Sequence, residues 1–198
     1  MSPIVLASSS EIRRQLLERA AVPCRVQPAR IDENAIKDAM LAEGASPRDI
    51  ADALAEAKAR KVSAKEPSAL VLGCDQVLDF GGTILSKPQD RDEAIAQLTA
   101  MRGQRHMLLS AAVIYEDAKP VWRHVGVVRL HMRDASDTWI ADYIARNWDS
   151  IRHAVGAYKL EEEGVRLFTR IDGDHFNVLG LPLLEILSYL TLRGTLPR

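Results

Sequence analysis

The sequence predicts an α/β protein with a mixed central sheet flanked by helices, and three observations support this fold class. Short apolar runs and longer segments with helical periodicity alternate along the first half of the chain. Two long strand-like segments, 107–115 and 122–132, then follow each other closely and are expected to pair as antiparallel neighbours. No repeat, low-complexity tract or long linker interrupts residues 1–198, which predicts one compact domain, either simple or two-lobed.

The individual elements follow from apolar spacing, capping residues and glycines. Short, mostly apolar runs predict strands at 3–7, 22–26, 69–74, 107–115, 122–132 and 165–171. Helical periodicity between a capping residue and a glycine or loop predicts helices at 10–20, 34–43, 46–61, 90–102, 136–144 and 182–193. Ser46-Pro47 is a clear helix start, and Asp79–Gly82 is typical of a hairpin turn.

Composition and charge narrow the functional classes. Hydrophobic residues are 47% and charged residues 27%, as in ordinary soluble globular proteins, and the net charge of −1 gives no basic bulk for nucleic acid. No window approaches the roughly 20 apolar residues of a membrane-spanning helix, and the first residues lack a signal-peptide pattern. Cys24 and Cys74 show no metal-like spacing, and Cys74 is expected to be a buried free thiol. We therefore expect a cytoplasmic protein without membrane or nucleic-acid partners.

The first candidate site is the turn Ser8-Ser-Ser10 between the strand at 3–7 and the helix at 10–20. A helix N-terminus presents unpaired N–H groups and a partial positive charge, which suit a phosphate. The serine hydroxyls and Arg13 or Arg14 would add hydrogen bonds and charge. The alternative is a capping box formed by Ser8 and Glu11.

Further candidates are single charged residues, and each also has an ordinary explanation. Asp75 follows an apolar strand, where a carboxylate can bind a hard cation or activate water, but an exposed turn aspartate would look the same. Asp32-Glu33 are metal ligands or part of a solvated loop, and Lys58 and Lys87 are phosphate contacts or surface lysines. The glycine-rich loops 154–159 and 173–182 are expected to line a site, whereas the five histidines show no metal-ligand spacing.

In combination and in this order, the motifs resemble those of the Maf family of nucleoside triphosphate pyrophosphatases over nearly the whole chain. The motifs that carry the resemblance are Leu6-Ala-Ser-x-Ser10, Asp32-Glu33, Gly73-Cys-Asp75, Lys87-Pro88, Gly156-Ala-Tyr158 and Asn177-Val-Leu-Gly-Leu-Pro182. The resemblance implies an elongated two-lobed α/β domain with a cleft, related to the inosine triphosphatase fold. It also implies hydrolysis of a nucleoside triphosphate to the monophosphate and pyrophosphate with Mg²⁺ or Mn²⁺.

The same resemblance implies roles for particular residues. Asp75 is expected to be the catalytic aspartate, which orients or deprotonates the attacking water, and a metal ligand, and Glu33 the second metal ligand. The expected phosphate-binding residues are Ser8, Ser10, Arg13, Lys58 and Lys87. Water would attack the α-phosphorus. Arg13, Lys58 and Lys87 would neutralise the charge of the triphosphate and of the departing pyrophosphate.

Two departures from the family pattern bear on activity and substrate. The common Ser-Pro-Arg-Arg is here Ser10-Glu-Ile-Arg13, so Ile12 replaces an arginine, and Arg14 substitutes for it only if the helix turns it inward. The dTTP and UTP branch has Gly-Ala-Asp-Thr where this chain has Gly73-Cys-Asp-Gln76. The sequence of this chain is more similar to that of the 7-methyl-GTP branch. Tyr158-Lys-Leu-Glu161 likewise replaces Tyr-Gly-Ile-Gln. Gln76, Tyr158 and Glu161 are therefore the candidates for base recognition.

Two other functions remain open at this level. A non-catalytic nucleotide-binding regulator of cell division is favoured by the missing arginine. A nucleotidyltransferase would need paired carboxylates for two metals, and no Asp-x-Asp occurs on a predicted strand. The sequence also leaves open a homodimer.

Overall fold

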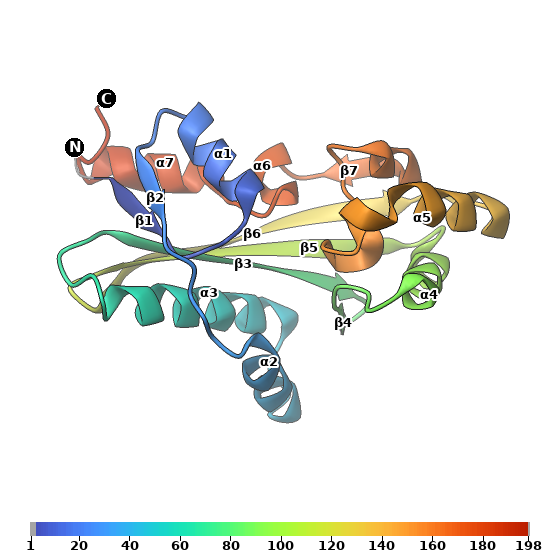
Figure 1. Cartoon of the computed structure of the whole chain (residues 1–198), viewed down its shortest axis with the longest axis horizontal. Coiled ribbons are helices and arrows are strands. Elements are labelled where there is room, and N and C mark those ends of the chain that lie inside the picture. Colours follow the sequence, from blue (N-terminus) through green and yellow to red (C-terminus); the bar gives the residue numbers. More distant parts are fainter. Residues whose placement is uncertain (1–2, 198) are drawn as a thin grey trace. The chain divides into compact units, whose positions relative to one another are not determined.

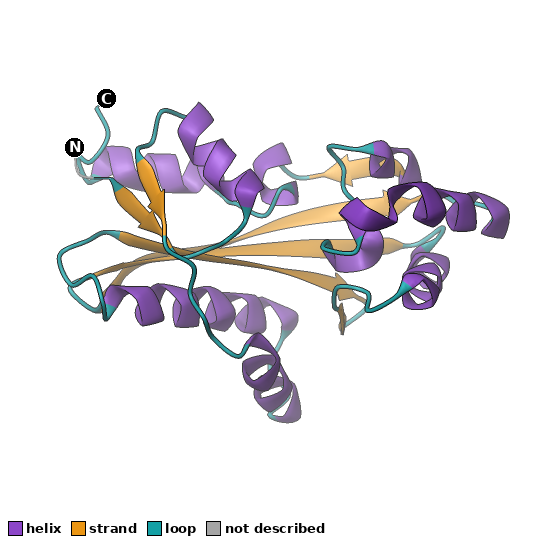
Figure 2. Ribbon diagram, in the orientation of Figure 1, coloured by secondary structure: helices purple, strands orange, loops and turns teal. Residues whose placement is uncertain are grey.

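The computed structural model describes residues 3–197 and confirms the α/β class with a mixed sheet (Figures 1 and 2). The strands are β1 (Ile4–Leu6), β2 (Cys24–Val26), β3 (Val71–Phe80), β4 (Thr83–Leu85), β5 (Arg105–Glu116), β6 (Lys119–Met132) and β7 (Phe168–Asp172). The α-helices are α1 (Glu11–Arg19), α2 (Glu33–Ala42), α3 (Pro47–Ser63), α4 (Arg91–Met101), α5 (Asp137–Ile151), α6 (His175–Val178) and α7 (Leu183–Leu192). Two short 3₁₀ helices are η1 (Val155–Ala157) and η2 (Glu163–Leu167).

The strands form one seven-stranded sheet in the order β2-β1-β3-β5-β6-β7, with β4 paired to β3. Strand β1 pairs in parallel with β2 and β3, whereas β3–β4 and β6–β7 are antiparallel. Strands β5 and β6 are neighbours joined by Asp117-Ala118, where both residues have positive φ, as a type I′ hairpin turn requires. The predicted pairing of the two long strands is therefore confirmed.

The chain divides into two compact units. Unit 1 holds the described residues up to Gln76, together with Leu109–Gly126 and the residues from His175 onward. Unit 2 holds Val77–Leu108 and Val127–Asp174. Within residues 3–197, no helix is long and apolar enough to cross a membrane.

In unit 1, the alternation of side chains along β3 decides which layer each residue meets. Leu72 and Cys74 lie in a buried cluster with residues of α1 and α7. Gly73 instead faces α3, because a Cβ added there would lie 2.2 Å from the carbonyl oxygen of Ala55. Figure 1 shows the same arrangement, with α3 on one side of β1 and β3 and with α1 and α7 on the other. Asp75, two residues after Gly73, therefore points to the α3 side.

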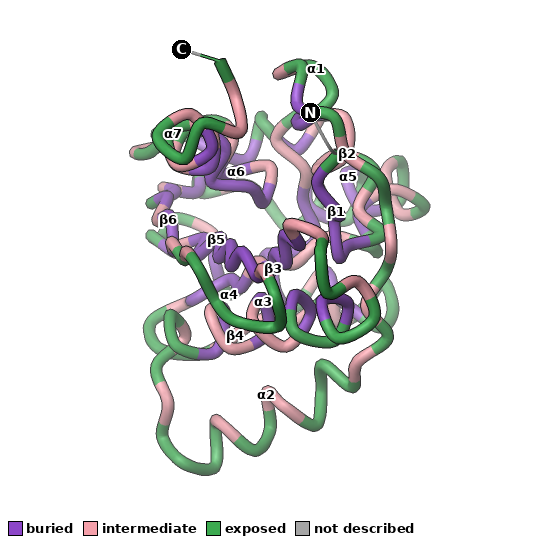
Figure 3. The backbone as a smooth tube through the Cα atoms, turned by 90° about the vertical axis from the view of Figure 1, so that its left-hand side faces the viewer, coloured by how far each residue is buried: buried purple, intermediate pink, exposed green. Residues whose placement is uncertain are grey.

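Helix α2 packs on α3 but has no buried residue, as its exposed and half-exposed backbone in Figure 3 shows. Its apolar side chains Ile36 and Met40 are only partly buried. The helix begins at Asp32, whose side chain accepts a hydrogen bond from the backbone N–H of Ala35 at 2.9 Å. The contribution of α2 to the site comes from this first turn.

In unit 2, α4 packs against α5 and η1, and β6 pairs with β7. Val128, Leu130 and Met132 on β6 are buried, whereas Arg129 is exposed and His131 is half-buried, which confirms the predicted one-sided strand. Buried His106 and Tyr158 lie beside Phe168, with the Tyr158 hydroxyl 2.8 Å from Nε2 of His106.

Several elements differ from the predictions, among them α5, which runs on to Ile151 beyond the predicted end at residue 144. Strand β3 does not end at Cys74 but continues to Phe80. Gly73 packs closely against α3 and Asp75 pairs with Lys58, so neither residue forms a turn. The predicted strand 165–171 starts only at Phe168, since Glu163–Leu167 form η2, in which Val165 is 49% exposed. The short helix α6 was not predicted.

Candidate active site

The ammonium group of Lys58 lies between two carboxylates in unit 1. Its Nζ is 2.6 Å from Oδ1 of Asp75 and 2.9 Å from Oε1 of Glu33. Lys58 comes from α3, Asp75 from β3 and Glu33 from the first residue of α2. The Lys58 and Asp75 side chains are 10% and 9% exposed, whereas Glu33 is half exposed. Three residues predicted separately from the sequence thus form one cluster, named here the acid–lysine cluster.

The close approach of α3 to β3 lets Lys58 reach Asp75. At Gly73, an added Cβ would lie 2.2 Å from the Ala55 carbonyl oxygen, 2.6 Å from the Ala59 nitrogen and 2.9 Å from the Ala59 Cβ. Ala55 and Ala59 are fully buried and one helical turn apart, so only small residues separate the helix from the strand. This role of Gly73 was not predicted, although two alanines at a spacing of four residues are typical of close helix packing.

The start of α2 separates the roles of Asp32 and Glu33. Asp32 is the N-cap, and its carboxylate accepts a hydrogen bond from the backbone N–H of Ala35. Glu33 is the first helical residue, and its side chain contacts Lys58. Asp32 is therefore a capping residue, while Glu33 belongs to the acid–lysine cluster.

Arg13 joins the serine turn to the strand that carries Asp75. Its Nη1 donates to Oγ of Ser8 at 3.3 Å and to the carbonyl oxygen of Cys74 at 3.1 Å. Its Nε donates to the carbonyl oxygen of Gly180 at 2.8 Å. The guanidinium group is thereby held beside the residue that precedes Asp75. Gly180 belongs to the loop 173–182, which was expected to line a site, but its contact with Arg13, 167 residues away in sequence, was not predicted.

The serine turn itself combines capping with a buried hydroxyl. Ser10 is the N-cap of α1, and its Oγ accepts from the backbone N–H of Arg13 at 3.5 Å. Ser8 is 7% exposed, and its Oγ accepts from the backbone N–H of Ser10 at 3.2 Å. A capping box of Ser8 and Glu11 is therefore wrong, because the helix starts two residues later than that pattern requires.

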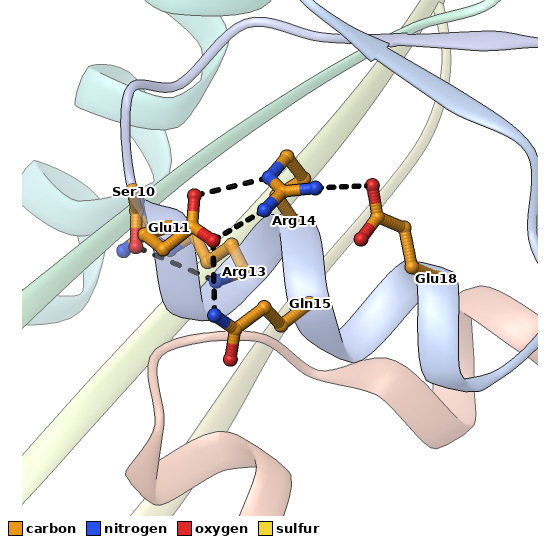
Figure 4. A network of polar contacts seen from close by, with 6 residues as sticks. All are labelled: Ser10, Glu11, Arg13, Arg14, Gln15 and Glu18. Carbon is orange, nitrogen blue, oxygen red and sulfur yellow. Dashed lines mark hydrogen bonds and ion pairs between the residues drawn. The ribbon is translucent and has the colours of Figure 1, made fainter.

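Arg14 does not replace the arginine that is missing at Ile12. Figure 4 shows its guanidinium between Glu11 and Glu18, with Nη1 2.5 Å from Oε1 of Glu18 and further hydrogen bonds to Glu11. The hydrogen bonds that Arg14 and Gln15 donate to Glu11 lower the pKa of this carboxyl to about 2. Both acids are exposed neighbours of Arg14 on the surface of α1, so its charge is already used there.

Gln76 points to the face of β3 opposite Asp75. Its Nε2 lies 3.0 Å from each of three acceptors, namely Oγ of Ser110 and the carbonyl oxygens of Asn177 and Val178. Gln76 thus anchors the end of α6 to the sheet. Recognition of a base by Gln76 stays a prediction.

The other predicted site residues belong to unit 2. Lys87 is exposed in the loop between β4 and α4, and Glu161 is also exposed. Tyr158 is 4% exposed, and its hydroxyl meets His106 inside the unit. Burial raises the pKa of Tyr158 well above its ordinary value. The roles predicted for these three residues stay predictions.

Burial dominates the electrostatics of the catalytic candidate. It raises the pKa of the Asp75 carboxyl, and the charge of Glu33 acts in the same direction. The ammonium of Lys58 and the guanidinium of Arg13 act in the opposite direction. Two cations from two helices therefore favour the ionised form of a carboxylate that burial disfavours.

The donor set of the acid–lysine cluster suits a hard divalent cation. The oxygens of Glu33 and Asp75 both contact one nitrogen, so their separation cannot exceed the sum of those two contact distances. Mg²⁺ and Mn²⁺ prefer oxygen ligands, and Mg²⁺ is commonly held by one or two carboxylates together with substrate phosphates. Within residues 3–197, no group of three or more His, Cys, Asp or Glu residues could hold a metal ion. A cation at Glu33 and Asp75 would therefore need further ligands from water or substrate.

The fold and the acid–lysine cluster together define an α/β protein with an acidic site next to a serine turn, and sequence comparison places that protein in a family. A model of the family described as Maf-like protein matches residues 3–192, so this chain belongs to that family. A protein of Roseobacter denitrificans named nucleoside triphosphate pyrophosphatase is 70% identical over 196 residues, which are 99% of this chain and 98% of the relative. A Ruegeria protein with the same name is 71% identical over 191 residues, 96% of each chain. A Brucella abortus protein named 7-methyl-GTP pyrophosphatase is 45% identical over 187 residues, 94% of each chain.

Proposed function

We propose that this protein hydrolyses a nucleoside triphosphate to the nucleoside monophosphate and pyrophosphate. The observation that carries the proposal is the acid–lysine cluster, in which one ammonium lies within hydrogen-bonding distance of a buried carboxylate and of a second, half-exposed carboxylate. The names of relatives that are 68–71% identical over nearly the whole chain support the same reaction.

In this reaction, water attacks the α-phosphorus, and the bond between that phosphorus and the oxygen leading to the β-phosphorus breaks. The oxygen leaves with pyrophosphate, and the attacking water loses a proton. A divalent cation held by Glu33 and Asp75 would supply charge neutralisation at the phosphate oxygens and acidify a coordinated water. Such phosphoryl transfers depend mainly on positioning and on charge neutralisation.

Asp75 would orient the attacking water and accept its proton. Burial raises the pKa of this carboxyl and so makes the ionised form a stronger base, while Lys58 and Arg13 keep that form accessible. Before the substrate binds, the side chain is held by Lys58 at 2.6 Å and by its place in strand β3.

Lys58 and Arg13 would neutralise the triphosphate, with the serine turn contributing hydroxyl and N–H groups. Arg13 is fixed by three hydrogen bonds, which orient its guanidinium before the substrate arrives. Lys87 of unit 2 is proposed as an additional phosphate contact because it is exposed and belongs to the Lys87-Pro88 motif.

For the base, we propose a preference for 7-methyl-GTP over dTTP and UTP. The Gly73-Cys-Asp-Gln76 sequence and the name of the Brucella relative support this choice. Glu161 is the exposed residue of the three base-recognition candidates, and a carboxylate there would attract the positive charge that 7-methylation places on guanine.

The test is hydrolysis by the purified protein of dTTP, UTP, CTP, GTP and 7-methyl-GTP with Mg²⁺ or Mn²⁺, followed by quantification of monophosphate and pyrophosphate. Asp75→Asn is run beside the wild type. Metal-dependent pyrophosphate release that the variant loses is expected, with 7-methyl-GTP cleaved fastest. Faster cleavage of dTTP and UTP overturns the base preference, and nucleotide binding without turnover in both proteins supports the regulator that Ile12 suggests.

A further inference from the structure

We infer that Lys58 is an internal cation that keeps Glu33 and Asp75 from binding a metal until a triphosphate draws its ammonium away. Lys58 would thus act as a positioning residue that makes metal binding depend on the nucleotide. This inference rests on the proposed function for the identity of the nucleotide, but its test does not require turnover.

The geometry places the lysine where a metal would need to be. Nζ of Lys58 contacts one oxygen of each carboxylate, at 2.6 Å and 2.9 Å, so the ammonium already bridges the two groups. A divalent ion bound to the same carboxylates would lie within a few ångströms of this ammonium and would be strongly repelled by it. Because the Lys58 side chain is only 10% exposed, water screens that repulsion poorly.

The charge of the cluster leads to the same conclusion. The two carboxylates carry two negative charges, and Lys58 cancels one of them. Within the described residues, no third acid, histidine or cysteine completes a metal site. Arg13 is a second cation near Asp75, so at most one charge stays uncancelled. Such a charge with two protein ligands is a weak site for a strongly hydrated divalent ion.

A triphosphate would change this balance. Its oxygens offer the ammonium a new anionic partner and offer the metal the ligands that the protein lacks. Lys58 has a flexible four-carbon chain, so it can turn from the carboxylates to a phosphate without movement of α3. The same side chain would then neutralise substrate charge during the reaction.

The experiment measures the affinity of the nucleotide-free protein for Mn²⁺ by the loss of the electron paramagnetic resonance signal of free Mn²⁺. Lys58→Met removes the charge and keeps much of the volume, and Lys58→Arg keeps the charge. Lys61→Met, an exposed lysine on the same helix, is the matched control. Lys58→Met is expected to bind Mn²⁺ about tenfold more tightly than the wild type. Lys58→Arg and Lys61→Met are expected to bind Mn²⁺ as the wild type does.

A second variant places the gained affinity at the cluster and guards against misfolding. Adding Asp75→Asn to Lys58→Met should abolish the gain, because it removes one of the two ligands. Mn²⁺ should also raise the melting temperature of Lys58→Met more than that of the wild type, and Lys58→Gln serves in its place if the methionine variant does not fold. Unchanged or weaker Mn²⁺ affinity in a folded, uncharged variant overturns the inference, even if the wild type hydrolyses nucleotides. If Lys58→Met gains Mn²⁺ affinity but the wild type hydrolyses no nucleotide, the proposed function is overturned and the inference about Lys58 is not.

Discussion

Replacing Gly73 with alanine is expected to push helix α3 away from strand β3 and to weaken both the fold and the active site. The added methyl would lie 2.2 Å from the carbonyl oxygen of Ala55 and 2.6 Å from the nitrogen of Ala59. A relaxed contact between carbon and oxygen is about 3.3 Å or longer, so helix and strand must separate by about 1 Å. The atoms in the way belong to the helix backbone and cannot turn aside.

The expected loss of stability follows from this overlap. Overpacking a core costs about 1–3 kcal/mol, and the rigid neighbours at Gly73 place the cost near the upper value, about 3 kcal/mol. For a protein of this size that corresponds to a fall in melting temperature of about 6–12 °C. Because Lys58 is on the displaced helix, its ammonium should move away from the site where it would neutralise the triphosphate, and pyrophosphate release should slow.

Urea denaturation followed by circular dichroism measures the free energy of unfolding of Gly73→Ala and the wild type. Gly194→Ala is the matched control, since an added Cβ there meets nothing within 4 Å and only the positive φ of 81° opposes it. The control should lose about 1 kcal/mol. If Gly73→Ala is no less stable than Gly194→Ala, the close helix–strand contact does not determine the position of Lys58 as argued.

The remaining predictions concern Arg13, its partner loop and a buried histidine. Arg13→Lys should lower kcat/KM by at least about tenfold, because lysine cannot make the hydrogen bonds from Nε and Nη1 at once, whereas Arg14→Ala should leave kcat/KM unchanged. Gly180→Ala should also lower kcat/KM, since its Cβ would lie 3.1 Å from Nη2 of Arg13 at a positive φ of 89°; full activity would contradict that role of the loop. Burial lowers the pKa of His106 from 6.5 to about 4. The protein should therefore have its full stability above pH 6.5 and lose stability as the pH falls towards 4, because the buried imidazole resists protonation. The expected loss is about 3 kcal/mol in the free energy of unfolding. His106→Gln should flatten this loss in urea titrations at several pH values and the exposed His153→Gln should not; parallel profiles for all three proteins would refute the assignment.

The elements that the sequence predicted well are those whose signals are local. Ser46 and Asp90 cap α3 and α4 as expected, because a cap depends only on the residues that immediately follow it. Alternation along β6 likewise identified its buried face. In contrast, β3 was cut short at Cys74, because Gly73 and Asp75 are poor strand formers unless a close helix and a lysine partner stabilise them.

The composition of the site could be predicted from motifs, but its geometry could not. Glu33, Lys58 and Asp75 were each identified, yet nothing in the sequence shows that one ammonium contacts both acids. The opposite directions of Asp75 and Gln76 follow from the pleat only once β3 is known to continue through them. The contact of Arg13 with Gly180 depends on long-range folding that local patterns do not encode.

The most direct test of the account is to carry out the hydrolysis in water enriched in oxygen-18 and to locate the label by mass spectrometry. Attack on the α-phosphorus places one labelled oxygen in the nucleoside monophosphate and none in pyrophosphate. The acid–lysine cluster around Asp75 is predicted to give this pattern, and Asp75→Asn should give no labelled monophosphate. Label in pyrophosphate or in inorganic phosphate would show attack at another phosphorus and would contradict the proposed reaction.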